Sequence, residues 1–364
     1  MHRAEIPTPA LLLDLDAFEA NIATMTRVVA ARGKGLRPHG KTHKCPEIAR
    51  RLVAAGALGA CTAKLGEAEV FAAHGIRGLL VTTAVVGPAK AARAAALAHT
   101  APDTIVVADD LAQVAVLDHA AARAGVRLRV AVDLYFGRTG VEPGAPALAV
   151  AQAIAAAPHL LFAGLQAYDA AASHTVGVEA RRARTTATMA EAVATRRLLE
   201  SHTIACPMVA AGSTGSYRFD AENDGITELQ PGSFIFMDTD YLSIGGDGGR
   251  AVYDDFRPAL SVATTVVSVH GDEAIVDGGY KAFSTDRPFA PVPVDRPDLS
   301  YAWAGDEHGR IDLRRATRRL AVGDRLEFRP PHCDPTVNLH DEIHALRGDD
   351  VEAVWAIAAR GKSQ

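Results

Sequence analysis

The feature that most constrains this chain is a regular alternation of β-type runs and helical segments between about residues 36 and 236. Ala/Arg/Glu-rich segments of helical length separate most of the runs, for example residues 179–202. Eight such units predict a (β/α)8 barrel of the TIM type rather than an open doubly wound sheet. No GxGxxG sequence follows the first run, so the main signature of a dinucleotide-binding fold is missing. The eight runs are residues 36–41, 58–64, 78–84, 104–110, 128–134, 161–169, 207–213 and 227–236.

A different pattern begins after about residue 256, where helical periodicity nearly vanishes. Residues 259–279 and 341–360 each contain two strand-like runs joined by a turn, and residues 325–331 predict a further strand. The N-terminal residues 8–16 also have a strand pattern, and they precede a predicted helix over 17–31. We therefore expect an α/β barrel over residues 17–250 and a second, mainly β domain formed by residues 1–16 and 251–364.

Composition narrows the classes of partner. The net charge is −5, which gives no basic field for nucleic acid. The N-terminus has no signal-peptide pattern, and the longest apolar runs are far shorter than a membrane span. Four cysteines without CxxC spacing indicate free thiols. We expect a cytoplasmic protein that acts on a small molecule and has no nucleic-acid or membrane partner.

The stretch RPHGKTHK, residues 37–44, gathers five nitrogen-bearing side chains at the end of the first barrel run. Taken alone, it favours a solvated basic turn. The Gly/Ser-rich segments 210–219 and 230–234 follow the last two runs, where barrels of this type frequently bind phosphate. A strand-end lysine near a phosphate site indicates a Schiff base with pyridoxal phosphate, so Lys41 is the candidate. We expect burial and the neighbouring cations Arg37, His39, His43 and Lys44 to lower the pKa of that amine.

A second nitrogen-rich site lies in residues 331–344, where His332 and Asp334 are two positions apart. On a strand both side chains would lie on the same face, with Cys333 on the other. An imidazole and a carboxylate together suit a divalent ion such as manganese, magnesium or zinc. A single His-x-Asp pair is weak evidence by itself.

Several stretches together resemble the D-threonine aldolase and eukaryotic-type D-serine dehydratase family, whose members are fold-type III pyridoxal phosphate enzymes with an alanine racemase-like barrel. The resemblance covers almost the whole chain. The matching stretches are residues 8–22, 36–49, 162–168, 212–241, 277–288 and 332–348.

The resemblance assigns roles to particular residues. It implies that Lys41 forms the Schiff base and that Arg138 lies near the phenolic oxygen of the cofactor. It places Gln230 where alanine racemases carry an arginine facing the pyridine nitrogen. It makes Tyr168 and His174 active-site residues. The implied phosphate cradle is Ser213, Thr214, Gly215, Ser216, Gly232 and Ser233, and the implied metal ligands are His332 and Asp334.

The resemblance also implies a reaction: retro-aldol cleavage of a D-3-hydroxy-α-amino acid to glycine and an aldehyde, with His174 as the base. The dehydratases carry His-x-Cys and use zinc, whereas His-x-Asp is the aldolase form and suits manganese or magnesium. The alternatives are a D-serine or 3-hydroxy-D-aspartate dehydratase, a 3-hydroxy-D-aspartate aldolase and a non-catalytic cofactor carrier. The family implies a homodimer. One departure concerns position 169, where Asp169 replaces the histidine that usually follows the tyrosine.

Overall fold

The computed structural model describes residues 1–364 and divides into two compact units. The barrel unit comprises Met25–Lys41, Pro46–Gly232 and Gly361–Gln364. The β unit comprises Met1–Thr24, Thr42–Cys45 and Ser233–Arg360. Helix α1 (Leu15–Ala31) contributes residues to both units.

Eight parallel strands form the sheet of the barrel unit, in the order β2-β9-β8-β7-β6-β5-β4-β3. A parallel bridge between His39 and Cys61 connects the segment after β2 to β3, so pairing continues round the ring. Each strand overlaps one of the eight predicted runs, which confirms the barrel. The strands are β2 (Gly35–Leu36), β3 (Cys61–Thr62), β4 (Leu80–Val81), β5 (Ile105–Ala108), β6 (Leu128–Asp133), β7 (Leu160–Ala167), β8 (Val209–Ala211) and β9 (Glu228–Leu229).

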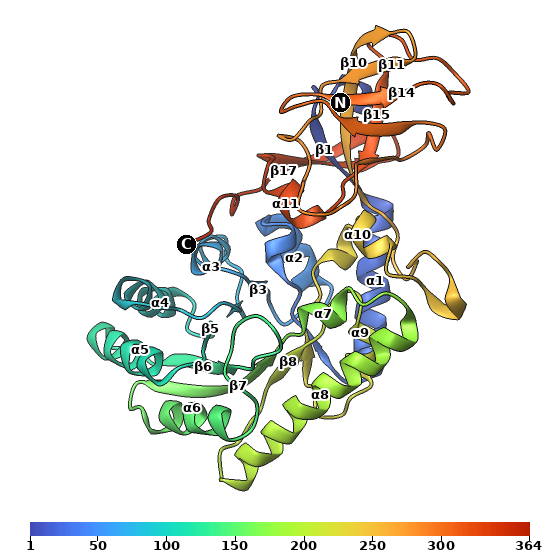
Figure 1. Ribbon diagram of the computed structural model, residues 1–364. Coiled ribbons are helices and arrows are strands. Elements are labelled where there is room, and N and C mark those ends of the chain that lie inside the picture. Colours follow the sequence, from blue (N-terminus) through green and yellow to red (C-terminus); the bar gives the residue numbers. More distant parts are fainter. The chain divides into compact units, whose positions relative to one another are not determined.

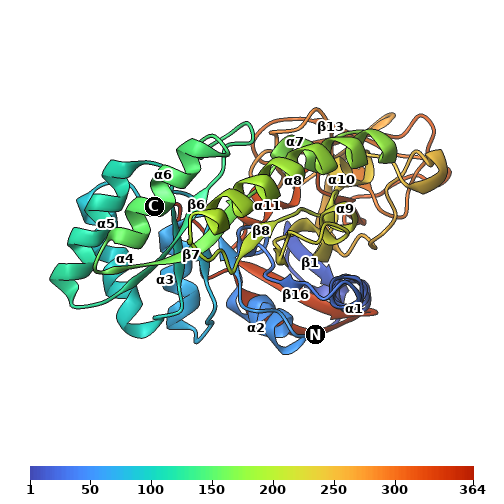
Figure 2. The ribbon, with the colours of Figure 1, turned by 90° about the horizontal axis from the view of Figure 1, so that it is seen from below.

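Helices cover the outside of this sheet (Figures 1 and 2). Local sequence sets their ends: Asp110 accepts a hydrogen bond from Ala112 N–H at the start of α5, and Gly125 ends that helix in the left-handed conformation. Pro88 begins α4, where its missing N–H costs nothing. The helices are α2 (Pro46–Ala54), α3 (Leu65–Ala73), α4 (Pro88–Thr100), α5 (Leu111–Ala124), α6 (Ala145–Ala156), α7 (Ala170–Ser173), α8 (Val178–Ser201) and α9 (Tyr217–Ala221).

One buried ion pair joins the two strands that complete the ring. The guanidinium of Arg37, just after β2, donates to both carboxylate oxygens of Glu228 on β9, at 2.7 and 2.9 Å. Both side chains are less than a tenth exposed. Such a paired geometry compensates the cost of burying the two charges and favours this strand pairing.

The β unit contains a nine-stranded sheet in which β1 lies between an antiparallel and a parallel neighbour, β10 and β16. The predicted strand pairs 259–279 and 341–360 are confirmed as β10–β11 and β16–β17, whereas the β13–β14 hairpin was not predicted. The strands are β1 (Ala10–Asp14), β10 (Leu260–His270), β11 (Glu273–Val276), β12 (Val292–Pro293), β13 (Ser300–Trp303), β14 (Gly309–Asp312), β15 (Arg325–Arg329), β16 (Glu342–Arg347) and β17 (Asp350–Ala356); the short helices are α10 (Thr239–Leu242) and α11 (Cys333–Val337). No helix in either unit is both long and apolar enough to cross a lipid bilayer.

Candidate active site

The carboxyl ends of five consecutive barrel strands carry most of the predicted site residues. Lys41 follows β2, Gln230 follows β9, and the turn Ser213–Ser216 follows β8. Tyr168 follows β7, and Arg138 follows β6. Because the sheet order is β2-β9-β8-β7-β6, these side chains lie in sequence along one arc of the ring. The predicted residues Ser233, His332 and Asp334 belong to the β unit instead.

Lys41 lies in a short 3-10 turn, Gly40–Thr42, that begins four residues after β2. Its backbone N–H donates to Nδ1 of His39 at 3.4 Å. Because that nitrogen accepts, Nε2 of His39 carries the proton and lies 3.1 Å from the hydroxyl of Thr82. The turn that holds Lys41 is therefore tied through His39 to the end of β4.

The prediction that cations surround Lys41 is wrong for two of the four residues, Arg37 and His43. Glu228 neutralises the charge of Arg37. His43 lies in the β unit, and burial lowers the pKa of its imidazole to about 3, so the ring is neutral at physiological pH. Two of the expected cations thus supply no net positive charge.

The turn predicted to bind phosphate, Gly212–Ser216 (called the phosphate turn below), is buried and internally hydrogen-bonded. Gly212 has φ +85°, and an added Cβ there would lie 3.2 Å from Oδ2 of Asp220. The hydroxyls of Ser213 and Ser216 are 2.8 Å apart, and each accepts the backbone N–H of the other residue. The turn leads directly into α9. Its three hydroxyl side chains and two glycines form a donor set suited to a phosphate group.

Asp220 lies behind this turn and is fully buried. Its Oδ2 has no hydrogen-bond partner, and it borders a cavity of about 10 Å³, the room of one water molecule. Burial raises the pKa of Asp220 to about 7, although a hydrogen bond from Ser216 opposes the shift. Below neutral pH the carboxyl group is therefore mostly uncharged and does not oppose an anion at the turn.

Replacing Asp220 with asparagine should change the pH dependence of stability. The unfolded chain loses this proton near the ordinary value of 3.8 and the folded chain near 7, so wild-type stability falls as pH rises through that window. The variant should gain, relative to wild type, up to about 1.4 kcal/mol per pH unit there. Urea unfolding at pH 5 and pH 8 measures the difference, with the exposed Asp224→Asn as control. If the unfolding free energies of Asp220→Asn and wild type differed by the same amount at both pH values, the raised pKa of Asp220 would be contradicted.

The end of β7 carries an unpaired acceptor. The side-chain N–H groups of Gln166 donate to the backbone oxygen of Thr82 and to Oδ1 of Asp133, at 3.0 and 2.8 Å. Its buried Oε1 has no partner in the protein. An orphaned acceptor at this end of the barrel is consistent with a ligand that supplies a donor.

Two carboxylates hold the loop that carries Arg138. Asp133 accepts the hydroxyl of Thr139 at 2.9 Å, and Asp109 accepts the backbone N–H of Gly140 at 2.9 Å. Burial raises the pKa of Asp133 to about 6. The guanidinium of Arg138 lies over the ring of Tyr168, 5.0 Å from its centroid. The structure thus brings Arg138 and Tyr168 into direct contact.

The His-x-Asp pair does not lie on a strand, so that local prediction was wrong. Pro331 and Pro335 flank the motif, and His332 is the residue that caps α11 while Asp334 lies in its first turn. Nδ1 of His332 lies 2.7 Å from Oδ2 of Asp286, an arrangement that would orient the imidazole and leave Nε2 available to bind a metal ion. Burial raises the pKa of the Cys333 thiol, which donates to Asp334 rather than serving as a thiolate.

The pair has no third side-chain ligand, since the chain contains no cluster of three or more His, Cys, Asp or Glu suited to a metal ion. A hard cation that keeps several waters is compatible with two protein ligands. The backbone N–H of Cys333 donates to the buried Asp238 at 2.8 Å, which fixes the start of α11. The donor set therefore fits manganese or magnesium better than a structural zinc site.

Comparison with known proteins follows the same division of the chain. The model of the alanine racemase N-terminal domain matches residues 13–240, and a serine dehydratase domain model matches residues 259–346. The chain is 40% identical to 3-hydroxy-D-aspartate aldolase of Paracoccus denitrificans, across 100% of this chain and 94% of the relative. It is 40% identical to D-threonine aldolase of an Arthrobacter species, across 99% and 94%. The crystal structure of D-threonine aldolase from Filomicrobium marinum superposes with a TM-score of 0.94 at 39% identity, covering 98% of this chain and 97% of the other.

The chain belongs to the D-threonine aldolase and 3-hydroxy-D-aspartate aldolase family. It is accordingly an enzyme of the carbon–carbon lyase class. The family resemblance found in the sequence is confirmed, as is the alanine racemase-like fold.

Within this aldolase family fold, several supporting residues escaped the sequence analysis. They are Asp238 and Asp286 beside the His-x-Asp pair, Asp220 behind the phosphate turn, and Arg181 and Arg184 on α8. The stretch 277–288 contains Asp286, and the stretch 212–241 contains Asp220 and Asp238, so the motif matches pointed to the right segments. Arg181 and Arg184 could not be identified from the sequence of α8, because their hydrogen-bond partners, Gly215 and Asp169, lie outside that helix.

Proposed function

We propose that this protein cleaves D-3-hydroxy-α-amino acids of the D-threonine type to glycine and an aldehyde, using pyridoxal phosphate and a divalent metal ion. The observation that carries the proposal is the placement of Lys41, Gln230 and the phosphate turn at the ends of three neighbouring strands. The 40% identity to two aldolases over the full chain supports the reaction class.

The residues of the barrel unit would hold the cofactor. Ser213, Thr214, Gly215 and Ser216 would bind its phosphate, with Gly232 and Ser233 at the following turn. Lys41 supplies the amine, Gln230 would face the pyridine nitrogen, and Arg138 stacked on Tyr168 would lie near the phenolic oxygen. When bound, pyridoxal phosphate acts as an electron sink for the bond broken at the α-carbon.

Two further groups act on the β-hydroxyl. His332 and Asp334 would hold the metal ion, which would supply Lewis-acid activation of the hydroxyl group. The imidazole of His174, at the end of α7, accepts the hydroxyl proton. Loss of that proton favours cleavage between the α- and β-carbons and release of the aldehyde.

Product identification tests this proposal. The purified protein is incubated with pyridoxal phosphate, manganese and, separately, D-threonine, D-phenylserine, 3-hydroxy-D-aspartate and D-serine. We expect glycine and the matching aldehyde from at least one of the first three. The aldolases and dehydratases differ in product, so a keto acid with ammonia would contradict the proposal. L-threonine serves as the stereochemical control and should not be cleaved.

A further inference from the structure

The segment between β7 and α8 carries Tyr168 and His174, yet its only helix cannot be stable by itself. Helix α7 spans four residues, Ala170–Ser173, and His174 is the C-cap residue that follows it. A single turn fixes several backbone dihedrals for very few hydrogen bonds. The position of His174 therefore depends on contacts from outside the helix.

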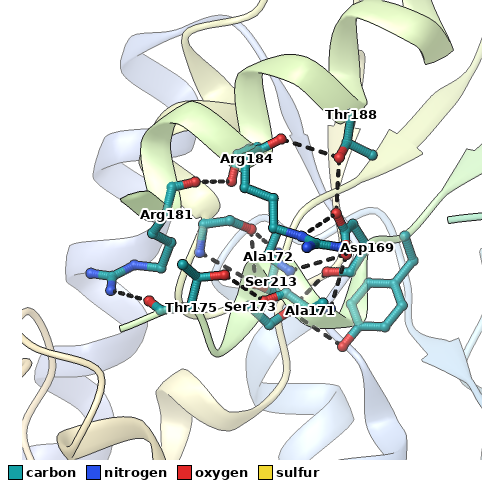
Figure 3. A network of polar contacts seen from close by, with 12 residues as sticks. Asp169, Ala171, Ala172, Ser173, Thr175, Arg181, Arg184, Thr188 and Ser213 are labelled. Atoms are coloured by element: carbon teal, nitrogen blue, oxygen red, sulfur yellow. Dashed lines mark hydrogen bonds and ion pairs between the residues drawn. The ribbon is translucent and has the colours of Figure 1, made fainter. Parts of the chain in front are cut away.

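Asp169 provides the first of these contacts. Its Oδ1 accepts the backbone N–H groups of Ala171 and Ala172 at 2.9 and 3.0 Å, as a helix-capping carboxylate does. The side chain is 4% exposed and points toward α8 (Figure 3). Asp169 thus orders the turn between Tyr168 and His174 from the protein interior.

Helix α8 provides the second contact. Oδ2 of Asp169 accepts hydrogen bonds from Nε–H of Arg184 at 3.1 Å and from the hydroxyl of Thr188 at 2.8 Å (Figure 3). These two residues are four apart and lie on one face of the helix. The buried carboxylate consequently has donors on both oxygens, which compensates its desolvation.

The same helix holds the phosphate turn. Arg181 is 1% exposed, and its guanidinium donates to the backbone oxygen of Gly215 and to that of Thr175, both at 2.9 Å. Arg181 and Arg184 are three apart on α8. The face of α8 that binds Asp169 therefore also holds the backbone of Gly215, in the phosphate turn, and of Thr175, the residue after His174.

We propose that Asp169 is a positioning residue: by clamping α7 to Arg184 and Thr188 of α8, it sets the place of His174 relative to the phosphate turn. The proposal rests on the proposed function, in which His174 accepts the proton. A displacement of about 1 Å in a reacting group can cost about a hundredfold in rate. The side-chain hydrogen bonds of Asp169 go to its own segment and to α8, and the residue also borders the small cavity that Ser216 and Asp220 line.

Three substitutions test the clamp. Asp169→Asn keeps an oxygen that can cap α7 but removes the charge that Arg184 binds. Arg184→Gln removes the positive charge on α8 that pairs with Asp169 and leaves Asp169 itself unchanged. Arg182→Gln is the matched control, because Arg182 lies on the same helix, is 45% exposed against 48% for Arg184, and pairs with Glu222 instead.

We expect Asp169→Asn and Arg184→Gln each to lower kcat by about tenfold while KM stays nearly constant. The double variant should lose little more than either single variant, since both break one interaction. The dissociation constant of pyridoxal phosphate, measured by protein fluorescence, should stay within about twofold of wild type because Arg181 still holds the phosphate turn. Arg182→Gln should match wild type.

A change in KM with kcat unchanged would overturn the proposal, because it would make Asp169 a substrate-binding group. Loss of cofactor affinity parallel to the loss of kcat would also overturn it. If the wild-type protein binds pyridoxal phosphate but cleaves none of the amino acids, the proposed function fails separately. Hydrogen exchange then decides the clamp: amides of residues 170–175 should exchange faster in Asp169→Asn and Arg184→Gln than in Arg182→Gln, and equal rates would refute it.

Discussion

Replacing Lys41 with alanine is expected to abolish amino-acid cleavage and to remove the visible absorbance band of bound pyridoxal phosphate. The amine at this strand end is the only group proposed to link the cofactor covalently. Loss of a covalent catalytic group commonly costs more than about a thousandfold in rate. The absorbance spectrum of the protein mixed with the cofactor and a product assay for glycine provide the two measurements.

The matched control is Lys64→Ala, because Lys64 follows β3, which the His39–Cys61 bridge joins to the segment before Lys41. This variant should keep both the band and turnover. Lys41→Arg should behave like Lys41→Ala, since a guanidinium keeps the charge but stays protonated and is not a nucleophile. Full activity in Lys41→Ala would refute the cofactor assignment.

The barrel could be predicted from sequence because each unit carries its own local signal. The 104–110 run ends in two aspartates, and the helix that follows it is capped by Asp110 at its start and Gly125 at its end. Eight repetitions leave few topologies. The turns of the β unit were equally local, since His270-Gly271-Asp272 joins β10 to β11 directly.

Features that depend on distant partners could not be predicted in this way. Arg37 and Glu228 are 191 positions apart, and only closure of the ring brings them together. Because the sequence does not show that Glu228 pairs with Arg37, it predicted Arg37 to be a free cation beside Lys41. Asp169 presented a similar problem: in the sequence it was a departure from the family pattern, whereas its contact with α8 depends on Arg184 and Thr188 of a later helix.

The His-x-Asp pair shows that the same two residues can be selected from a local structure that the chain does not adopt. Strand alternation was the reason given for placing His332 and Asp334 together. In the structure the two residues lie at the start of α11, and Pro335 in its first turn was the available signal. Asp286, 46 positions away, supplies the orienting carboxylate.

Removal of the metal ion is expected to stop cleavage, and loss of His332 should have the same effect. Wild-type activity should fall to background in chelator and return with manganese, whereas His332→Ala should remain inactive at any moderate manganese concentration.

Asp286→Asn should have a milder effect than His332→Ala. It leaves both proposed metal ligands in place but weakens the hydrogen bond to Nδ1 of His332, so the manganese concentration for half-maximal activity should rise by about tenfold to a hundredfold. Asp272→Asn, at a carboxylate of the β unit that pairs with Arg319 at 2.8 Å, should leave manganese activation unchanged. Cleavage that is indifferent to chelator would refute a metal role for His332 and Asp334, while an Asp286→Asn variant with normal manganese activation would show that the imidazole needs no orienting partner.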